Sequence, residues 1–175
     1  RIAGALQRFF PASVVATAVA MAELHALTEE LDLAMAEAWL ACSEGTADSD
    51  SLRYTKAWKH VGRASDRNRQ LTAVLAVGAE LDRLTRMPGL RMMLKMMRGP
   101  AHAAGLGSLQ SFLEAGFDTF AAMSGKGSHA LQFLKLIEAR EKHWIEQLFA
   151  DDVQTTQHLL ANALAAEANA NPHTR

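Results

Sequence analysis

Apolar residues recur at helical spacing along most of the chain, and the first long stretch carries two such stripes. One stripe consists of Ala20, Leu24, Leu27, Leu31, Met35, Ala38 and Cys42, and the second consists of Ala22, Ala26, Leu33 and Leu40. No Gly or Pro interrupts the chain between Pro11 and Gly45, so we predict one helix over about residues 12–42. Because this helix is apolar on two faces, we expect it to be the central helix of a bundle.

Polar and helix-breaking segments divide the rest of the chain into further predicted helices. We expect these over about residues 52–86, 90–97, 108–123, 128–149 and 152–168, followed by a frayed tail at 169–175. The predicted breaks are the loop SEGTADSDS at residues 43–51 and the pairs Pro88-Gly89 and Gly99-Pro100. The predicted N-caps are Asp50 or Ser51, Ser128, and Asp151 or Asp152.

Composition supports an all-helical protein. The chain has 33 Ala, 23 Leu and 8 Met, against only 7 Val and 3 Ile, which argues against an all-β fold. With 49% hydrophobic residues among 175, the chain has enough apolar surface to form a core. We therefore predict an all-α bundle of about five to six helices with a long antiparallel first pair. We expect a single helical domain over residues 1–168.

Charge is strongly segregated although the formal net charge is only -1. Residues 11–44 carry six acidic side chains and no Lys or Arg, whereas residues 52–70 carry six Lys or Arg and one Asp. Two antiparallel helices of opposite charge can pair along their flanks. A less favoured alternative is anion or nucleic-acid binding by the basic set, which comprises Arg53, Lys56, Lys59, His60, Arg63 and Arg67. The sequence pI of about 6.7 argues against nucleic acid.

Two polar features interrupt the apolar pattern. His25, Glu29 and Asp32 share one side of the first helix, so they are weak candidates for a metal site, although no His has Glu three residues before it. Glu141 falls near the middle of an apolar stripe, so we expect a buried carboxylate with a cationic partner such as Arg63, Arg67 or Arg69. A structural role is the favoured interpretation of both.

No catalytic motif is present. Dinucleotide and phosphate-loop fingerprints fail, and neither Gly-x-Ser-x-Gly nor His-Glu-x-x-His occurs. We expect no cofactor, and whether the protein is an enzyme stays open, with a non-enzymatic role favoured. The single Cys42 fits a cytoplasmic location without a membrane segment. As an alternative, Arg1 and Arg8 before the apolar run 9–22 have the form of a signal peptide, but the helical pattern continues into Glu23.

Four runs together resemble a family of uncharacterised bacterial helical proteins that is known as a domain of unknown function. They are ELHALTEELDLAMAEAWL (23–40), AWKHVGRASDRNRQL (57–71), MRGPAHAAGLGSLQSFLEAGFDTFAAM (97–123) and IEARE (137–141). The resemblance spans about residues 9–149 and implies that helical sequence precedes Arg1. It also implies a shared polar network of His25, Glu29, Asp32, Arg63, Asp66, Arg67, Asp118 and Glu141. It implies no activity.

Two classes of function remain. The favoured one is a non-enzymatic structural or interaction module that self-associates or binds a protein partner, because the apolar faces exceed what one small domain needs. The alternative is a small-molecule or metal site, possibly enzymatic, inside the bundle around His25, Glu29, Asp32 and Glu141.

Overall fold

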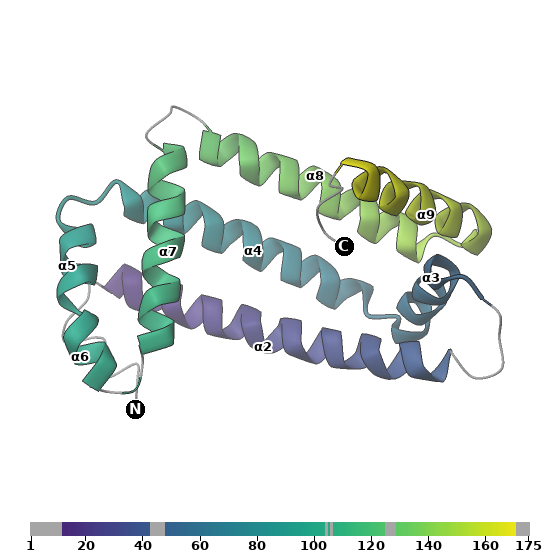
Figure 1. Ribbon diagram of the computed structural model, residues 1–175, viewed down its shortest axis with the longest axis horizontal. Coiled ribbons are helices and arrows are strands. Elements are labelled where there is room, and N and C mark those ends of the chain that lie inside the picture. The colour runs from purple at the N-terminus through teal and green to yellow at the C-terminus, as the bar shows by residue number, and fades with distance from the viewer. Residues whose placement is uncertain (1–11, 43–47, 104, 106, 125–128, 171–175) are drawn as a thin grey trace. The chain divides into compact units, whose positions relative to one another are not determined.

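The computed structural model is all-helical over the residues it describes, which are 12–42, 48–103, 105, 107–124 and 129–170 (Figure 1). The helices are α2 (Ala12–Ala41), α3 (Asp50–Val61), α4 (Ala64–Thr85), α5 (Leu90–Met96), α6 (Arg98–Ala103), α7 (Gly107–Ser124), α8 (His129–Phe149) and α9 (Val153–Ala170). The described residues form no strand, which confirms the predicted fold class. The helices are more numerous than the five to six expected.

The extra helices arise where local chemistry differs from the prediction. The helix predicted over 52–86 is two helices, because Gly62 takes the left-handed conformation (φ 63°) and its N–H bonds to the carbonyl of Trp58. The helix predicted over 90–97 ends at Met96 as α5, and a short helix that was not predicted, α6, begins at Arg98, just before Gly99-Pro100. Both residues lie in the first turn of α6, where a proline needs no N–H partner.

The predicted helix caps are confirmed in part. Asp152 accepts hydrogen bonds from the backbone N–H groups of Gln154 and Thr155, at 3.0 and 3.1 Å, as predicted for the start of α9. The cap of α3 is Ser49 and not Asp50 or Ser51, since the Ser49 hydroxyl accepts from the backbone N–H of Leu52. The predicted cap Ser128 lies outside the described residues. The last helix extends to Ala170, beyond the predicted end at 168.

The chain divides into two compact units, each described by itself. Unit 1 comprises Arg1–Leu24 and Leu71–Ala139, and unit 2 comprises His25–Gln70 and Arg140–Arg175. The single domain over residues 1–168 stays a prediction beside this division.

Unit 1 has a core formed by α4, α5 and α7. Its buried members are Leu84, Leu90, Leu94 and Phe117, and Val14, Met87, Met93 and Ala121 pack against them. Gln110 donates to the carbonyl of Leu94 at 2.6 Å, inside this region. The apolar core and this hydrogen bond therefore both hold α5 against α7.

Unit 2 shows the antiparallel pairing that the sequence predicts. Three contacts run in opposite order along the chain: Arg53 with the carbonyl of Trp39, Arg63 with Glu30, and Gln70 with Thr28. Leu31 and Thr55 are fully buried here. Within this unit, helix α9 packs against α3 (Figure 1), and the rings of Trp58 on α3 and Phe149 on α8 are in contact.

Candidate functional site

The three weak metal candidates lie on the surface of α2. The Nδ1 of His25 is 3.9 Å from Oε1 of Glu29, and both side chains are at least 70% exposed. Asp32 is also exposed. Among the described residues, no group of three or more His, Cys, Asp and Glu side chains has an arrangement that could hold a metal ion. The pair His25–Glu29 is an exposed helical ion pair, whose contribution to stability is small.

Arg63 connects two helices of unit 2. Its Nε donates to Asp66 at 2.6 Å, and its Nη1 donates to Glu30 on α2 at 2.7 Å. Asp66 also pairs with Arg69 at 3.1 Å. The hydrogen bonds from Arg63 to Asp66 and Glu30 raise the pKa of Arg63, because both carboxylates stabilise its charged form. The arrangement of cation between two carboxylates is that of a structural ion pair.

Arg67 lies half-buried against aromatic side chains. Its guanidinium is 4.4 Å from the ring centroid of Trp58, and its Nη1 donates to Gln70 at 3.1 Å. Burial lowers the pKa of Arg67, and Tyr54 and Asp32 oppose that shift. Burial likewise raises the pKa of Tyr54, while the charge of Arg67 acts against it. The cation–π contact fixes the start of α4 against α3.

The indole of Trp58 has an unusual environment. Its ring contacts Tyr54 and Phe149 with centroids 6.0 and 5.6 Å apart. Its Nε1 is buried and has no hydrogen-bond partner within the described part of the chain. Trp58 is therefore held by packing and by Arg67.

The eight residues of the predicted network are divided between the two units. Asp118 belongs to unit 1, where it pairs with Arg91 at 3.0 Å. The other seven belong to unit 2, in which Arg63 contacts Asp66, and Asp32 and Glu141 act on Arg67 through longer-range electrostatics. The network implied by the family resemblance stays a prediction as a functional unit.

The expected burial of Glu141 is wrong, because this side chain is exposed. All of residues 139–143 are exposed, whereas Leu134 before them and Ile145 after them are buried. The buried positions of α8 thus fall into two sets, one in each unit, and Glu141 lies in the interval between the sets. A stripe that is continuous in the sequence is interrupted in the structure.

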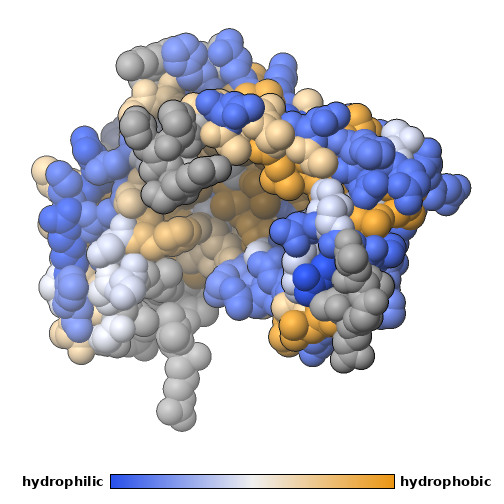
Figure 2. Space-filling view, turned by 45° about the vertical axis from the view of Figure 1, so that its right-hand side comes forward, coloured by the Kyte–Doolittle hydropathy of each residue, from blue (hydrophilic) through white to orange (hydrophobic). Residues whose placement is uncertain are grey.

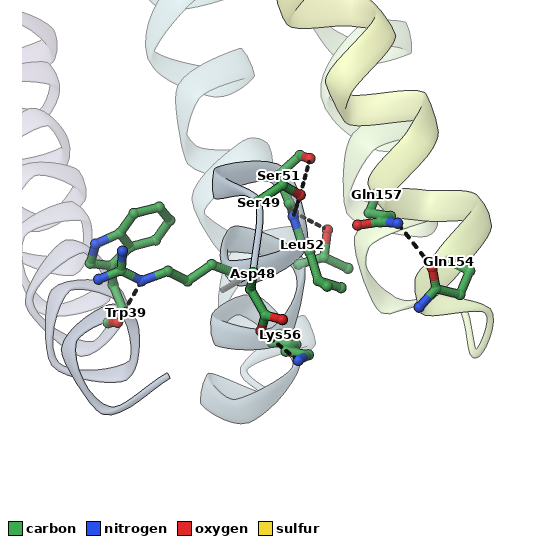
Figure 3. Close-up of polar contacts among 10 residues, drawn as sticks. Trp39, Asp48, Ser49, Ser51, Leu52, Lys56, Gln154 and Gln157 are labelled. Carbon is green, nitrogen blue, oxygen red and sulfur yellow. Dashed lines mark hydrogen bonds and ion pairs between the residues drawn. The ribbon is translucent and has the colours of Figure 1, made fainter. Parts of the chain in front are cut away.

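The basic set of residues 52–70 contacts the chain itself. Around the start of α3, Lys56 pairs with Asp48 at 2.6 Å, and the guanidinium of Arg53 reaches the backbone of Trp39 (Figure 3). The Arg53 guanidinium also lies 4.1 Å from the Trp39 ring centroid. Lys59 donates to the carbonyl of Ala150. With Arg63 and Arg67 engaged as described above, the internal role of these cations has direct support.

The two apolar stripes of α2 differ in their exposure. The first is covered: Leu27, Leu31 and Ala38 are 8%, 0% and 3% exposed. The second is open, since Ala22 and Ala26 are exposed and Leu33 and Leu40 are 62% and 68% exposed. The expectation that α2 is surrounded on both faces is therefore wrong.

We call the open face in unit 2 the outer stripe. It consists of Ala26, Glu29, Leu33, Ala36 and Leu40, all of them exposed. The spacing alternates between three and four residues, which is the spacing that helices use when they pack lengthwise on another helix.

Other large apolar side chains are also exposed. Figure 2 shows apolar residues at the surface among hydrophilic ones. Outside α2 they include Met92, Met96, Phe112, Leu131, Phe133, Leu136, Leu159 and Leu164. The outer stripe differs from these in its regular spacing over 15 residues of one helix.

Sequence reasoning missed Glu30, Gln70 and the stacking of Arg67 on Trp58. A signal was present in Gly62, since a glycine C-cap between Trp58 and Arg67 allows the chain to turn and bring the cation onto the ring.

Fold and site together define an all-α protein with an open helix face and internally paired charges. The chain belongs to the family described as "Domain of unknown function (DUF8198)", which it matches over residues 1–155. No match was found among curated proteins or among solved structures. Of the described helices, none combines the length and the hydropathy that a membrane-spanning segment needs.

Proposed function

We propose that this chain is a non-enzymatic protein-interaction module that binds a second copy of itself or another protein through the outer stripe. The observation that carries the proposal is the exposure of Leu33 (62%) and Leu40 (68%), two turns apart on α2. Full burial of one Leu side chain contributes about 1.5–3 kcal/mol. Covering both in a complex would therefore contribute substantially to affinity.

The backbone that presents the stripe is well supported. Leu31, on the opposite side of the same helix, is fully buried, and Arg63 and Gln70 both contact the same stretch of α2. A stripe on a pre-formed helix loses little conformational entropy on binding. The five positions span about 22 Å at 1.5 Å per residue, enough for two heptads of a partner helix.

A small-molecule or metal site has weaker support. His25 and Glu29 are highly exposed, and Glu141 is exposed as well. These side chains are not enclosed by apolar residues as ligand-binding groups usually are. Anion or nucleic-acid binding by the basic set has less support for a different reason, because Arg53, Lys56, Lys59, Arg63 and Arg67 already contact carboxylates, carbonyls or rings of unit 2.

Site-specific photo-crosslinking tests the proposal. Benzoylphenylalanine would replace Leu33 in one sample and Leu131 in another, since both are more than half exposed Leu residues on long helices. Each variant would be expressed in cells that contain the natural partners, irradiated and analysed by intact-mass measurement. We expect position 33 to form a protein adduct of discrete mass, either a dimer or a heteromeric complex.

Adduct formation from position 131 at the same yield would show that exposure alone causes crosslinking. Absence of any adduct at position 33 above the level at 131 would contradict the proposal. Circular dichroism of both variants checks that the helical fold is retained.

A further inference from the structure

We infer that the occupant of the outer stripe is a basic amphipathic helix of another protein and not a second copy of this chain. This inference rests on the proposed function, and it concerns the chemistry of the partner. It follows from the charges that border the stripe.

Acidic side chains lie on both sides of the outer stripe and within it. With about 100° per residue, Glu30 and Glu37 fall on one flank, Asp32 falls on the other, and Glu29 lies in the stripe itself. All four are exposed. Helix α2 contains no Lys or Arg from Ala12 to Ala41.

The rest of unit 2 compensates only part of this charge. Arg63 pairs with Glu30, yet the Glu30 side chain stays 62% exposed. His25 is 3.9 Å from Glu29, and both side chains are at least 70% exposed. Arg67 interacts with Asp32 only at longer range, and Arg53, a further cation that reaches α2, is bound to the carbonyl and ring of Trp39. The open face therefore presents a negative potential to a partner.

A second copy is a poor occupant on electrostatic grounds. When the outer stripes of two copies pair in parallel, Glu29 lies against Glu29 of the other copy, and Asp32 lies beside Glu37 of the other copy. Antiparallel pairing centred on Leu33 places Glu30 beside Glu37 of the other copy. Like charges meet in both directions, so the face disfavours its own copy while its apolar residues still favour burial.

A complementary partner is defined by the same positions. Lys or Arg residues would flank its apolar stripe and face Glu30, Glu37 and Asp32. A further Lys or Arg would reach Glu29. The small residues Ala36, between Leu33 and Leu40, and Ala26, two turns before Leu33, leave room for large apolar side chains of the partner.

Two synthetic helical peptides test the inference on the full chain. Both have the same three-and-four-spaced Leu and Ile stripe, and they differ only in flanking residues, all Lys in one and all Glu in the other. Fluorescence anisotropy at low salt gives the two dissociation constants. We expect the Lys peptide to bind at least tenfold more tightly, with a preference that shrinks as salt increases.

Variants of the chain connect the preference to this face. Glu30→Lys/Glu37→Lys should reverse the order of the two peptides. Leu33→Ser/Leu40→Ser should weaken both peptides at least tenfold, because it removes the shared apolar contacts. The matched control Leu159→Ser/Leu164→Ser, at exposed positions of α9, should leave both dissociation constants unchanged.

Failure of the inference is distinguishable from failure of the proposed function. Equal binding of both peptides that depends on Leu33 and Leu40, or a dimer adduct from the crosslinker at position 33, would overturn the basic partner but keep the interaction module. No peptide binding together with no adduct at position 33 would overturn both.

Discussion

At the residue scale, Leu31 and Leu33 provide a matched test of the two faces of α2. Leu31 is fully buried, and Leu33 is 62% exposed two residues later on the same helix. We expect Leu31→Ala to lower the free energy of unfolding by about 2–5 kcal/mol, because it leaves a cavity. Leu33→Ala should change it by no more than about 0.5 kcal/mol. Urea unfolding of both variants measures the difference.

Equal losses from the two substitutions would contradict this assignment, since they would mean that Leu33 is covered too. The helix propensities of the two sites are matched, because both replace Leu by Ala inside one helix.

The hydrogen bonds that Glu114 accepts predict that the protein loses stability at acid pH. Glu114 accepts hydrogen bonds from Arg98 and from Gln110, the latter at 2.9 Å. The hydrogen bonds from Arg98 and Gln110 lower its pKa from 4.5 to about 2. Because the folded-state pKa is depressed, the stabilisation is fully present above pH 4.5 and is lost as the pH falls toward about 2.

The corresponding measurement is the melting temperature as a function of pH for the natural chain and for Glu114→Gln. We expect the natural chain to lose stability more steeply between pH 4.5 and 2, since the variant has no carboxylate to protonate at this position. Parallel curves over that interval would mean that Arg98 does not stabilise the folded state through Glu114.

At the element scale, Gly62 determines where α3 ends. Its φ of 63° is costly for any residue with a Cβ, so we expect Gly62→Ala to destabilise the protein by about 1–2 kcal/mol. Gly116 inside α7 is the control, because a Cβ built there meets nothing within 4 Å. Gly116→Ala should stabilise by about 0.5–1 kcal/mol through helix propensity. Thermal unfolding should therefore shift in opposite directions for the two variants.

The helix bounds show what periodicity can and cannot predict. Helix α2 is predicted over 12–42 and ends at Ala41, because its uninterrupted apolar pattern and the polar segment after it leave little choice. The break at Gly62 was missed because apolar and basic residues keep helical spacing through it, from Lys59 to Arg67. Only the backbone conformation of Gly62 distinguishes a cap from a tolerated helical glycine.

At the scale of the whole molecule, the sequence predicted both stripes of α2 but not which one is covered. Whether a stripe is buried depends on which other helices pack against it, and the spacing of apolar residues in one helix does not predict that. The charge of Glu29, which lies within the outer stripe, indicated in part that this stripe is the exposed one. The covered stripe has no charged residue among its seven members.

Glu141 shows the complementary failure. Its position in an apolar stripe of α8 predicts burial only if one surface covers the entire helix. The stripe is instead divided between two units, and residues 139–143 are exposed. A periodic pattern that is extended across the division therefore wrongly predicts that Glu141 is buried.

The small net charge has a consequence for solubility. At a sequence pI of about 6.7 and a formal charge of -1 at pH 7, the chain carries little net charge near neutral pH. It also exposes Leu33, Leu40, Met92 and Phe112. Apolar contacts between molecules are opposed least when the net charge is near zero, so we expect the lowest solubility close to pH 6.7.

Glu167→Lys, at an exposed position of α9 outside the outer stripe, separates the charge effect from the apolar effect. It changes the formal net charge from -1 to +1 without altering any exposed apolar side chain. If net charge governs solubility, the minimum measured by light scattering across pH 5–9 should move to a higher pH. If contacts at the outer stripe dominate instead, the minimum should stay near pH 6.7, and Leu33→Ser/Leu40→Ser should raise solubility at every pH.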